Sequence, residues 1–253
     1  MSNDIKLDSH YDYFCETHHN DAENNLDTRR HYRMLDLVKP FCRIFRGKDS
    51  RWLTIGDGFA REAIFLKKKG IKHVTCSNYA FSPKKQMKIK SYVDDCMEID
   101  VENMPKINQD FILCKESFHH FSRPFKGLYE MLDHCEYGVI LIEPQENPPM
   151  KDHYESQGDY QYRISFRELC KAAWALKLPH VAVRGFNDPI GGLYKDKNYK
   201  DYLKRCANLD ELGKKNKRPY DLGVYAILKK TLTANDRELL SDFEILDRPL
   251  PND

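Results

Sequence analysis

The sequence lacks a strong charge of either sign. Its 253 residues carry 41 Lys and Arg against 39 Asp and Glu, which leaves a formal net charge of +2. No overall electric field would hold such a chain to nucleic acid or to an acidic membrane, and either partner would need a local basic patch. We therefore expect no membrane partner, and the charge argues against nucleic acid.

Long hydrophobic runs are also missing. The most apolar short stretch, 139–142, is far below the ~20 residues that a helix needs to span a bilayer. The first eight residues contain neither the basic segment nor the apolar segment of a secretory signal. We expect a cytoplasmic protein without a transmembrane helix.

Closely spaced cysteines are absent. No two of the eight cysteines form the C-x2-4-C spacing of a metal knuckle or the C-x-x-C spacing of a redox pair. We expect reduced, partly buried thiols and no bound metal. The cysteines occupy positions 15, 42, 76, 96, 114, 135, 170 and 206.

What the sequence does contain is a regular alternation of short apolar runs and helical patterns. A hydrophobic fraction of 41% is normal for a globular domain and excludes disorder of the whole chain. Because the apolar runs do not alternate strictly with polar residues, they indicate a parallel sheet covered on both faces. The predicted fold class is α/β with seven strands. The strands are expected at 51–55, 73–76, 96–99, 111–114, 138–142, 180–184 and 224–228, and the helices at 60–69, 82–91, 124–135 and 166–178.

The domain boundaries follow changes in composition. Residues 1–47 are polar, with a helical pattern over 30–39, and are expected to form a helical cap that serves as a lid or mediates a homodimer. The main domain spans 48–230 and carries inserted loops at 145–163 and 187–222, which are long and polar enough to be lids or binding segments. Residues 231–253 are interpreted as a short amphipathic piece and a Pro-rich tail.

The residues that follow the first two strands are the first candidates for a binding site, because open parallel sheets bind ligands at the carboxyl ends of their strands. Gly56-Asp57-Gly58 follows the first strand, and glycines let a ligand approach the backbone and the next helix N-terminus; a plain tight turn is the alternative. Ser77 and Asn78 follow the second strand, where nucleotide-binding folds place an acceptor for ribose hydroxyls. A simple turn is the alternative there too.

Polar residues also follow the third and fourth strands. Asp100 is placed to accept a hydrogen bond from an exocyclic adenine amine, or it caps a short helix. His119 and His120 are adjacent, and imidazole titrates near neutral pH, so either can be a general base or a hydrogen-bond partner of the substrate. The alternative is that one of them caps the loop. Glu116 is a weaker catalytic candidate.

The substrate is expected to meet residues after the fifth strand. Glu143 ends that strand and is a candidate for contact with the substrate. In the loop that follows, Tyr160, Tyr162 and Arg163 could place two phenols and a guanidinium over an acceptor, and the guanidinium would favour a phosphate or carboxylate. The alternative is a surface hairpin that leads into the next helix.

From residue 52 to residue 146 the sequence resembles the class I S-adenosylmethionine-dependent methyltransferases, in particular the small-molecule branch called type 11. The matching stretches are 52–58, 74–78, 99–105, 110–121 and 138–144. The resemblance implies a Rossmann-like, mostly parallel sheet of seven strands whose last strand is antiparallel. It also implies S-adenosylmethionine as the cofactor.

The same resemblance implies roles for individual residues at the cofactor. Gly56 and Gly58 would lie against its methionine part, Asn78 would reach its ribose, and Asp100 with Val101 would frame its adenine.

At the reacting end, Lys115 would begin the loop beside the sulfonium. His119 and His120 would face a small polar acceptor. Type 11 enzymes occur in bacterial surface-polysaccharide pathways, so the expected acceptor is a sugar, nucleotide-sugar or phosphorylated building block, with O-methylation favoured.

Three positions depart from the family pattern. The acid that usually precedes the first glycine by two positions is Thr54, the third glycine is Ala60, and the ribose acid is the neutral Asn78. Asp57 is expected to restore negative charge near the ammonium or sulfonium. The departures favour, as the alternative, a non-catalytic cofactor-binding or scaffold protein with the same fold.

Overall fold

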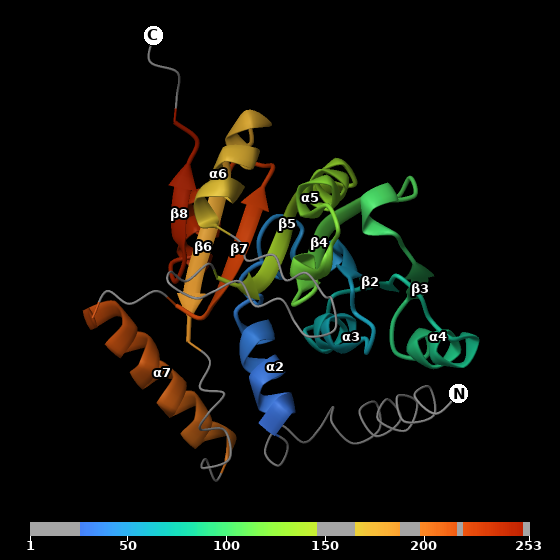
Figure 1. The fold of residues 1–253 in the computed structure, drawn as a ribbon, viewed down its shortest axis with the longest axis horizontal. Coiled ribbons are helices and arrows are strands. Elements are labelled where there is room, and N and C mark those ends of the chain that lie inside the picture. Colours follow the sequence, from blue (N-terminus) through green and yellow to red (C-terminus); the bar gives the residue numbers. More distant parts are fainter. Residues whose placement is uncertain (1–25, 146–164, 188–197, 217–219, 250–253) are drawn as a thin grey trace.

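The computed structural model of the chain describes residues 26–145, 165–187, 198–216 and 220–249. Within these ranges the strands form one eight-stranded sheet in the order β3-β2-β1-β4-β5-β7-β6-β8 (Figure 1). The first five strands pair in parallel, and β7 runs antiparallel between β5 and β6. The strands are β1 (Arg51–Ile55), β2 (His73–Asn78), β3 (Asp95–Glu98), β4 (Gln109–Lys115), β5 (Cys135–Pro144), β6 (His180–Phe186), β7 (Leu222–Leu228) and β8 (Glu244–Asp247).

The α/β class and the antiparallel seventh strand are confirmed, whereas the count of seven strands is wrong. The eighth strand, β8, pairs antiparallel with β6 inside the segment that was interpreted as a tail. Its four residues are only half-buried or exposed, so it is held by backbone pairing at the sheet edge. A short strand with a polar residue at each end leaves no hydrophobic pattern in the sequence to identify it.

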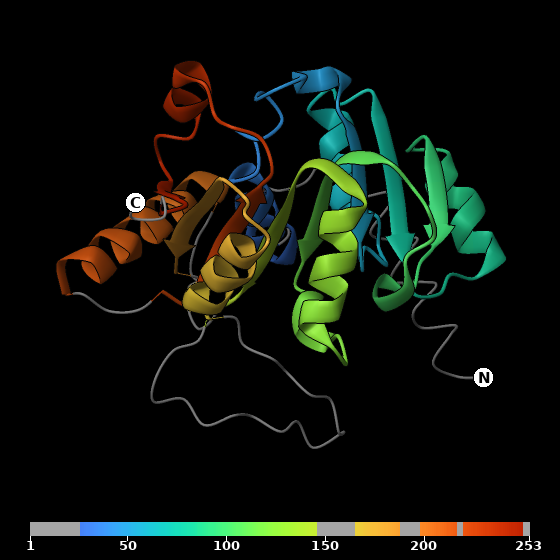
Figure 2. The ribbon, with the colours of Figure 1, turned by 90° about the horizontal axis from the view of Figure 1, so that it is seen from above.

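The helices cover both faces of the sheet. Figure 2 shows α5 and α6 on one face and α2 and α3 on the other. None of the helices in the described ranges is long and apolar enough to cross a membrane. The α-helices are α2 (Leu26–Asp36), α3 (Arg61–Lys68), α4 (Pro83–Lys90), α5 (Pro124–Asp133), α6 (Phe166–Ala175), α7 (Tyr199–Asn216) and α8 (Ala234–Leu239), and the short 3-10 helices are η1 (Gly47–Asp49), η2 (Val101–Asn103) and η3 (Phe118–His120).

Two hydrophobic cores explain why the strands appear as continuous apolar runs. In β1, Trp52 packs into the core beneath α3, whereas its neighbour Leu53 packs into the core beneath α5 and α6. Ile112 and Leu113 of β4 divide between the two cores in the same way. Successive side chains of a strand point to opposite faces, so a sheet covered on both faces needs apolar residues at every position.

The helix α7 lies inside the segment 187–222 that was predicted to be an inserted loop, and it packs against α2. Arg33 of α2 donates to Asp210 Oδ2 of α7 at 2.8 Å and to the backbone oxygen of Asn187. The Arg33 guanidinium also lies 5.2 Å from the centre of the Phe186 ring. The insertion between β6 and β7 is thereby fixed to the N-terminal helix.

Candidate functional site

A cavity of about 540 Å³ lies at the carboxyl ends of β1 to β4. Four of the predicted cofactor residues line it, namely Gly56, Asn78, Asp100 and Val101, and so does the catalytic candidate His120. The complete lining consists of Ile55, Gly56, Asn78, Tyr79, Ile99, Asp100, Val101, Glu102, Ser117, His120, Phe121, Ser122 and Arg123. The rule that ligands bind beyond the strand ends therefore located the cavity from the sequence.

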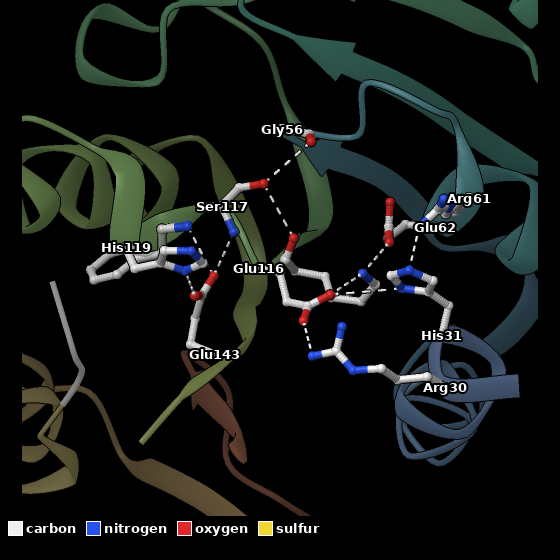
Figure 3. A network of polar contacts seen from close by, with 11 residues as sticks. Arg30, His31, Gly56, Arg61, Glu62, Glu116, Ser117, His119 and Glu143 are labelled. Atoms are coloured by element: carbon white, nitrogen blue, oxygen red, sulfur yellow. Dashed lines mark hydrogen bonds and ion pairs between the residues drawn. The ribbon is translucent and has the colours of Figure 1, made fainter. Parts of the chain in front are cut away.

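The glycine turn brings the ends of three strands together. Gly56 has φ +71°, and a Cβ at this position would lie 2.5 Å from the Cβ of Ser117. The Ser117 hydroxyl lies 3.2 Å from the Gly56 carbonyl oxygen and donates to it (Figure 3). A Cβ at Gly58 would lie 3.2 Å from the amide nitrogen of Asn78. Glycine is needed at position 56, because its φ is positive and Ser117 approaches so closely, whereas a side chain at position 58 would press on the Asn78 amide.

Ser77 and Asn78, which end β2, have different surroundings. Ser77 is 1% exposed and donates to the Thr54 carbonyl oxygen at 2.6 Å, so it ties β2 to β1 and does not line the cavity. Asn78 lines the cavity, and its amide nitrogen donates to the Ala80 carbonyl oxygen at 3.0 Å. An amide carries an acceptor as well as donors, so Asn78 has the chemistry to accept a hydrogen bond from a ligand hydroxyl.

Asp100 caps η2, as the alternative prediction held, while it also lines the cavity. Its carboxylate accepts from the Asn103 amide at 2.7 Å and from the Glu102 backbone N–H at 3.0 Å. These two hydrogen bonds lower the pKa of Asp100. A carboxylate has about four lone-pair sites, so capping leaves it able to accept a hydrogen bond from a ligand.

Asp57 does not line the cavity, and its role in restoring negative charge near the cofactor stays a prediction. Its Oδ2 accepts from the Thr54 hydroxyl at 3.0 Å and from the Ala63 backbone N–H at 2.9 Å. Burial and the charge of Glu62 raise the pKa of Asp57 well above its usual range. Burial opposes ionisation of Glu62 as well, but the Lys115 ammonium lowers its pKa to about 2. The opposite directions of the two pKa shifts favour a proton on Asp57 over one on Glu62.

A buried network of charged side chains lies beside the glycine turn, and we call Arg30, Glu62, Lys115 and Glu116 the charge network (Figure 3). Lys115 Nζ lies 3.0 Å from Glu62 Oε1 and 2.9 Å from Glu116 Oε2, and its side chain is 4% exposed. Arg30 of α2 donates to Glu116 Oε1 at 2.6 Å. Burial raises the pKa of Glu116, but Lys115 and Arg30 lower it to about 2.

Glu116 stands at a strained turn. Its φ of +50° is uncommon for a residue other than glycine, and such outliers often mark functional sites. His31 Nδ1 lies 3.7 Å from Glu116 Oε2, and the other ring nitrogen of His31 contacts Arg61. Sequence reasoning missed Arg30, His31 and Glu62, because no local pattern indicates that α2 and α3 meet the end of β4.

Glu143 occupies a different place from the predicted contact with the substrate. Its side chain is 0% exposed, and its Oε1 accepts from the backbone N–H groups of Ser117 at 2.9 Å and Phe118 at 2.8 Å. Its Oε2 lies 2.5 Å from His119 Nδ1. The His119 ring centre is 4.1 Å from that of His120. Glu143 therefore holds the loop after β4 and one of the two predicted histidines.

Comparison with known proteins identifies the fold. No family model matches the sequence, and neither does any curated protein. Among solved structures, a possible histamine N-methyltransferase from Thermotoga maritima aligns with a TM-score of 0.54 and 16% identity, covering 88% of this chain and 96% of its own. The chain has the S-adenosylmethionine-dependent methyltransferase fold.

Two further methyltransferases share this fold. The 1,6-didemethyltoxoflavin-N1-methyltransferase of Burkholderia thailandensis aligns with a TM-score of 0.54 and 12% identity over 78% of this chain and 79% of its own. A phosphoethanolamine N-methyltransferase of Haemonchus contortus aligns with a TM-score of 0.57 and 13% identity over 79% of this chain and 53% of its own. At these identities the likeness is one of fold.

Three predicted substrate residues lie outside the described part of the chain, namely Tyr160, Tyr162 and Arg163. Their role stays a prediction. Within the described ranges, no group of three or more His, Cys, Asp or Glu side chains could hold a metal ion.

Proposed function

We propose that this chain is an S-adenosylmethionine-dependent methyltransferase that acts on a small polar acceptor. The observation that carries the proposal is the pairing of two chemically different sites at the same sheet edge, an open cavity lined by polar and apolar side chains and the charge network. They adjoin through Glu116 and Ser117, which are consecutive residues of which the second lines the cavity. The methyltransferase fold of the solved neighbours supports the proposal, and two of them contain S-adenosylhomocysteine.

The cavity fits the nucleoside half of the cofactor. Its volume falls within the range of about 300–1,000 Å³ that is usual for small-molecule sites. Asn78 would accept from a ribose hydroxyl, and Asp100 would accept from the adenine amine. Val101 and Phe121 supply apolar surface for the ring.

The charge network fits the amino-acid half, which carries one ammonium and one carboxylate. Glu116 would hold the ammonium, and the Arg30 guanidinium would hold the carboxylate through charge-assisted hydrogen bonds. The two side chains are 19% and 22% exposed, so both can be reached. They are already 2.6 Å apart, so little rearrangement is required to present both charges to a ligand.

Bound S-adenosylmethionine supplies a methyl group that is already activated by its sulfonium. The protein's own contribution is to hold that ligand at both ends and to fix the loop after β4 beside it. The hydrogen bond between Ser117 and Gly56 keeps the ends of β1 and β4 in contact. Glu143 holds the loop after β4 by accepting from the backbone N–H groups of Ser117 and Phe118. Such positioning accounts for much of the acceleration available to a transfer of this kind.

The acceptor is proposed only as a small polar molecule. The neighbouring enzymes are named for different acceptors, including histamine and 1,6-didemethyltoxoflavin, and none of the names indicates a surface polysaccharide. A sugar or phosphorylated acceptor, O-methylation, the type 11 branch, the cytoplasmic location and the homodimer stay predictions.

Calorimetric titration tests the proposal. The full chain is titrated with S-adenosylmethionine, S-adenosylhomocysteine and methylthioadenosine, with NAD as the control. We expect micromolar binding of both methionine-containing ligands, weaker binding of methylthioadenosine, which lacks the amino-acid part, and no binding of NAD. Absence of binding would contradict the proposal and favour a scaffold, whereas binding in a chain that transfers no methyl group to any acceptor would favour the non-catalytic alternative.

A further inference from the structure

A buried histidine and carboxylate lie beside the cavity, and holding the cofactor does not require the histidine. Glu143 at the end of β5 is 0% exposed and receives three hydrogen-bonding groups, two of which are backbone N–H groups on Oε1. The third is the His119 imidazole at 2.5 Å from Oε2. A buried carboxylate with three such partners is held in one orientation.

The chemistry of this contact selects one form of the imidazole. Two backbone N–H groups occupy Oε1, and a carboxylate can only accept hydrogen bonds, so Oε2 is the acceptor that faces the ring. His119 must therefore carry its hydrogen on Nδ1. In the neutral ring the lone pair is then on Nε2, where it can take a proton.

The His119 ring lies next to a residue that lines the cavity. Ser117 and His120 both line the cavity, and His119 does not. His119 lies between them in the chain, with its ring centre 4.1 Å from that of His120. The His119 side chain is 9% exposed, whereas Glu143 is completely covered, so the accessible part of the pair belongs to the imidazole.

We propose that Glu143 is a positioning residue that holds His119 in the Nδ1–H form, so that Nε2 can accept a proton from the methyl acceptor. The inference rests on the proposed function and deepens it. As the bond from the acceptor oxygen or nitrogen to the methyl carbon forms, the sulfur–methyl bond breaks with its electron pair left on sulfur, and the acceptor proton goes to His119 Nε2. The substrate class is therefore a hydroxyl, which loses its proton as the bond forms, or a protonated amine, which must give its proton to Nε2 before its nitrogen can attack.

The ¹⁵N NMR spectrum of histidine-labelled full-length protein, recorded where the imidazole is neutral, tests the proposal. His119→Gln identifies the signal by its loss, and His120→Asn serves as the matched control. We expect the Nδ1–H form to exceed the Nε2–H form by about 10-fold or more, as a hydrogen bond to a charged group would produce. A wild-type His119 with its hydrogen on Nε2 would overturn the proposal without any variant of Glu143.

The same NMR measurement on the Glu143→Gln variant provides a second test. The glutamine oxygen can retain both backbone hydrogen bonds, but the amide nitrogen now faces His119 and must donate to Nδ1. We expect the ratio of the two ring forms to reverse by about 10-fold or more; an unchanged ratio overturns the proposal. Tyr225 and Cys114 also approach Glu143, and burial raises the pKa of both, so His119 and His120 are the groups whose titration must be followed.

Titration with S-adenosylhomocysteine separates this inference from the proposed function. We expect wild type and Glu143→Gln to bind it equally, since the exchange retains the backbone contacts of Ser117 and Phe118. Failure of the wild type to bind would overturn the proposed function and, with it, the role in methyl transfer, whatever ring form is found. Transfer only to acceptors that have no proton to lose, by a chain that does bind, would overturn the assignment of the base alone.

Discussion

The cavity and the charge network adjoin at the same sheet edge, but they are built in opposite ways. The cavity is open and is lined at its core by an amide, a capped carboxylate and apolar side chains. The charge network is closed, with Lys115 4% exposed between two carboxylates and Arg30 added from a different helix. An open site whose charged groups lie at the surface can admit a nucleoside without leaving a charge unpaired, whereas buried charges must be balanced before any ligand arrives.

This difference predicts which substitutions lower the stability of the fold and which lower the affinity for a ligand. Changes in the buried part of the charge network should act mainly on folding, because an unpaired charge is left in a dry site. Changes at its rim or in the cavity should act mainly on binding.

The largest expected effect comes from removing the central cation. Lys115→Met leaves Glu62 and Glu116 without their ammonium partner and should lower the free energy of unfolding by about 3–5 kcal/mol at pH 7. Urea denaturation measures it. Lys72→Met is the matched control, because Lys72 pairs with Asp49 at the surface, and it should change stability by about 0–1 kcal/mol. Equal effects would show that the charge network is not a buried unit.

Asp57→Asn should alter the pH dependence of stability. The folded pKa of Asp57 is raised well above its ordinary value, so above that ordinary value the folded state retains a proton that the unfolded state loses. Stability of the wild type therefore falls with rising pH, by up to about 1.4 kcal/mol per pH unit. The amide of Asp57→Asn removes this slope. The free energy of unfolding of the variant, relative to that of the wild type, should therefore rise between pH 5 and pH 8. Parallel denaturation curves at all pH values would contradict a protonated Asp57.

Glu116→Gln and Arg30→Gln should weaken only the ligand that has an amino-acid end. Each removes one charge-assisted contact, and we expect affinity for S-adenosylhomocysteine to fall by about 10-fold or more while affinity for methylthioadenosine stays the same. Arg184→Gln, which removes a surface pair with Asp242, is the control. Equal losses for both ligands would place the charge network outside the ligand site.

Asn78→Asp should have the smallest effect. A carboxylate accepts from ribose hydroxyls more strongly than an amide does, so affinity for S-adenosylhomocysteine and for methylthioadenosine should rise together by about threefold to tenfold. Calorimetry on the same preparations measures both. A gain for one ligand only would show that Asn78 does not face the ribose.

The cavity could be predicted from the sequence, whereas the charge network could not. The cavity residues Gly56, Asn78 and Asp100 were predicted because each directly follows an apolar run, and a parallel sheet brings such positions together. The contact between Arg30 and Glu116 joins residues 86 positions apart, and it depends on where α2 docks. No spacing rule encodes that position.

The direction in which side chains point was the second feature of the site that the sequence could not predict. The sequence placed Glu143 correctly at the end of the fifth strand but could not show that the carboxylate turns inward to Ser117 and His119. It likewise placed Asp57 in the turn without showing that its carboxylate faces α3. These orientations depend on packing partners that come from elsewhere in the chain.

The position of β7 in the sheet has a consequence for synthesis of the chain on the ribosome. The strands β1 to β5 can pair as they emerge, but within the described residues β6 pairs with β7 and β8, which are both translated later. The partner of Arg33, Asp210, is 177 residues downstream. Translation of that stretch at about 5–20 residues per second takes roughly 10–35 s. The part of the sheet that forms the cavity can thus be completed first, and the part that anchors α2 through α7 is closed only when β7 and β8 leave the ribosome.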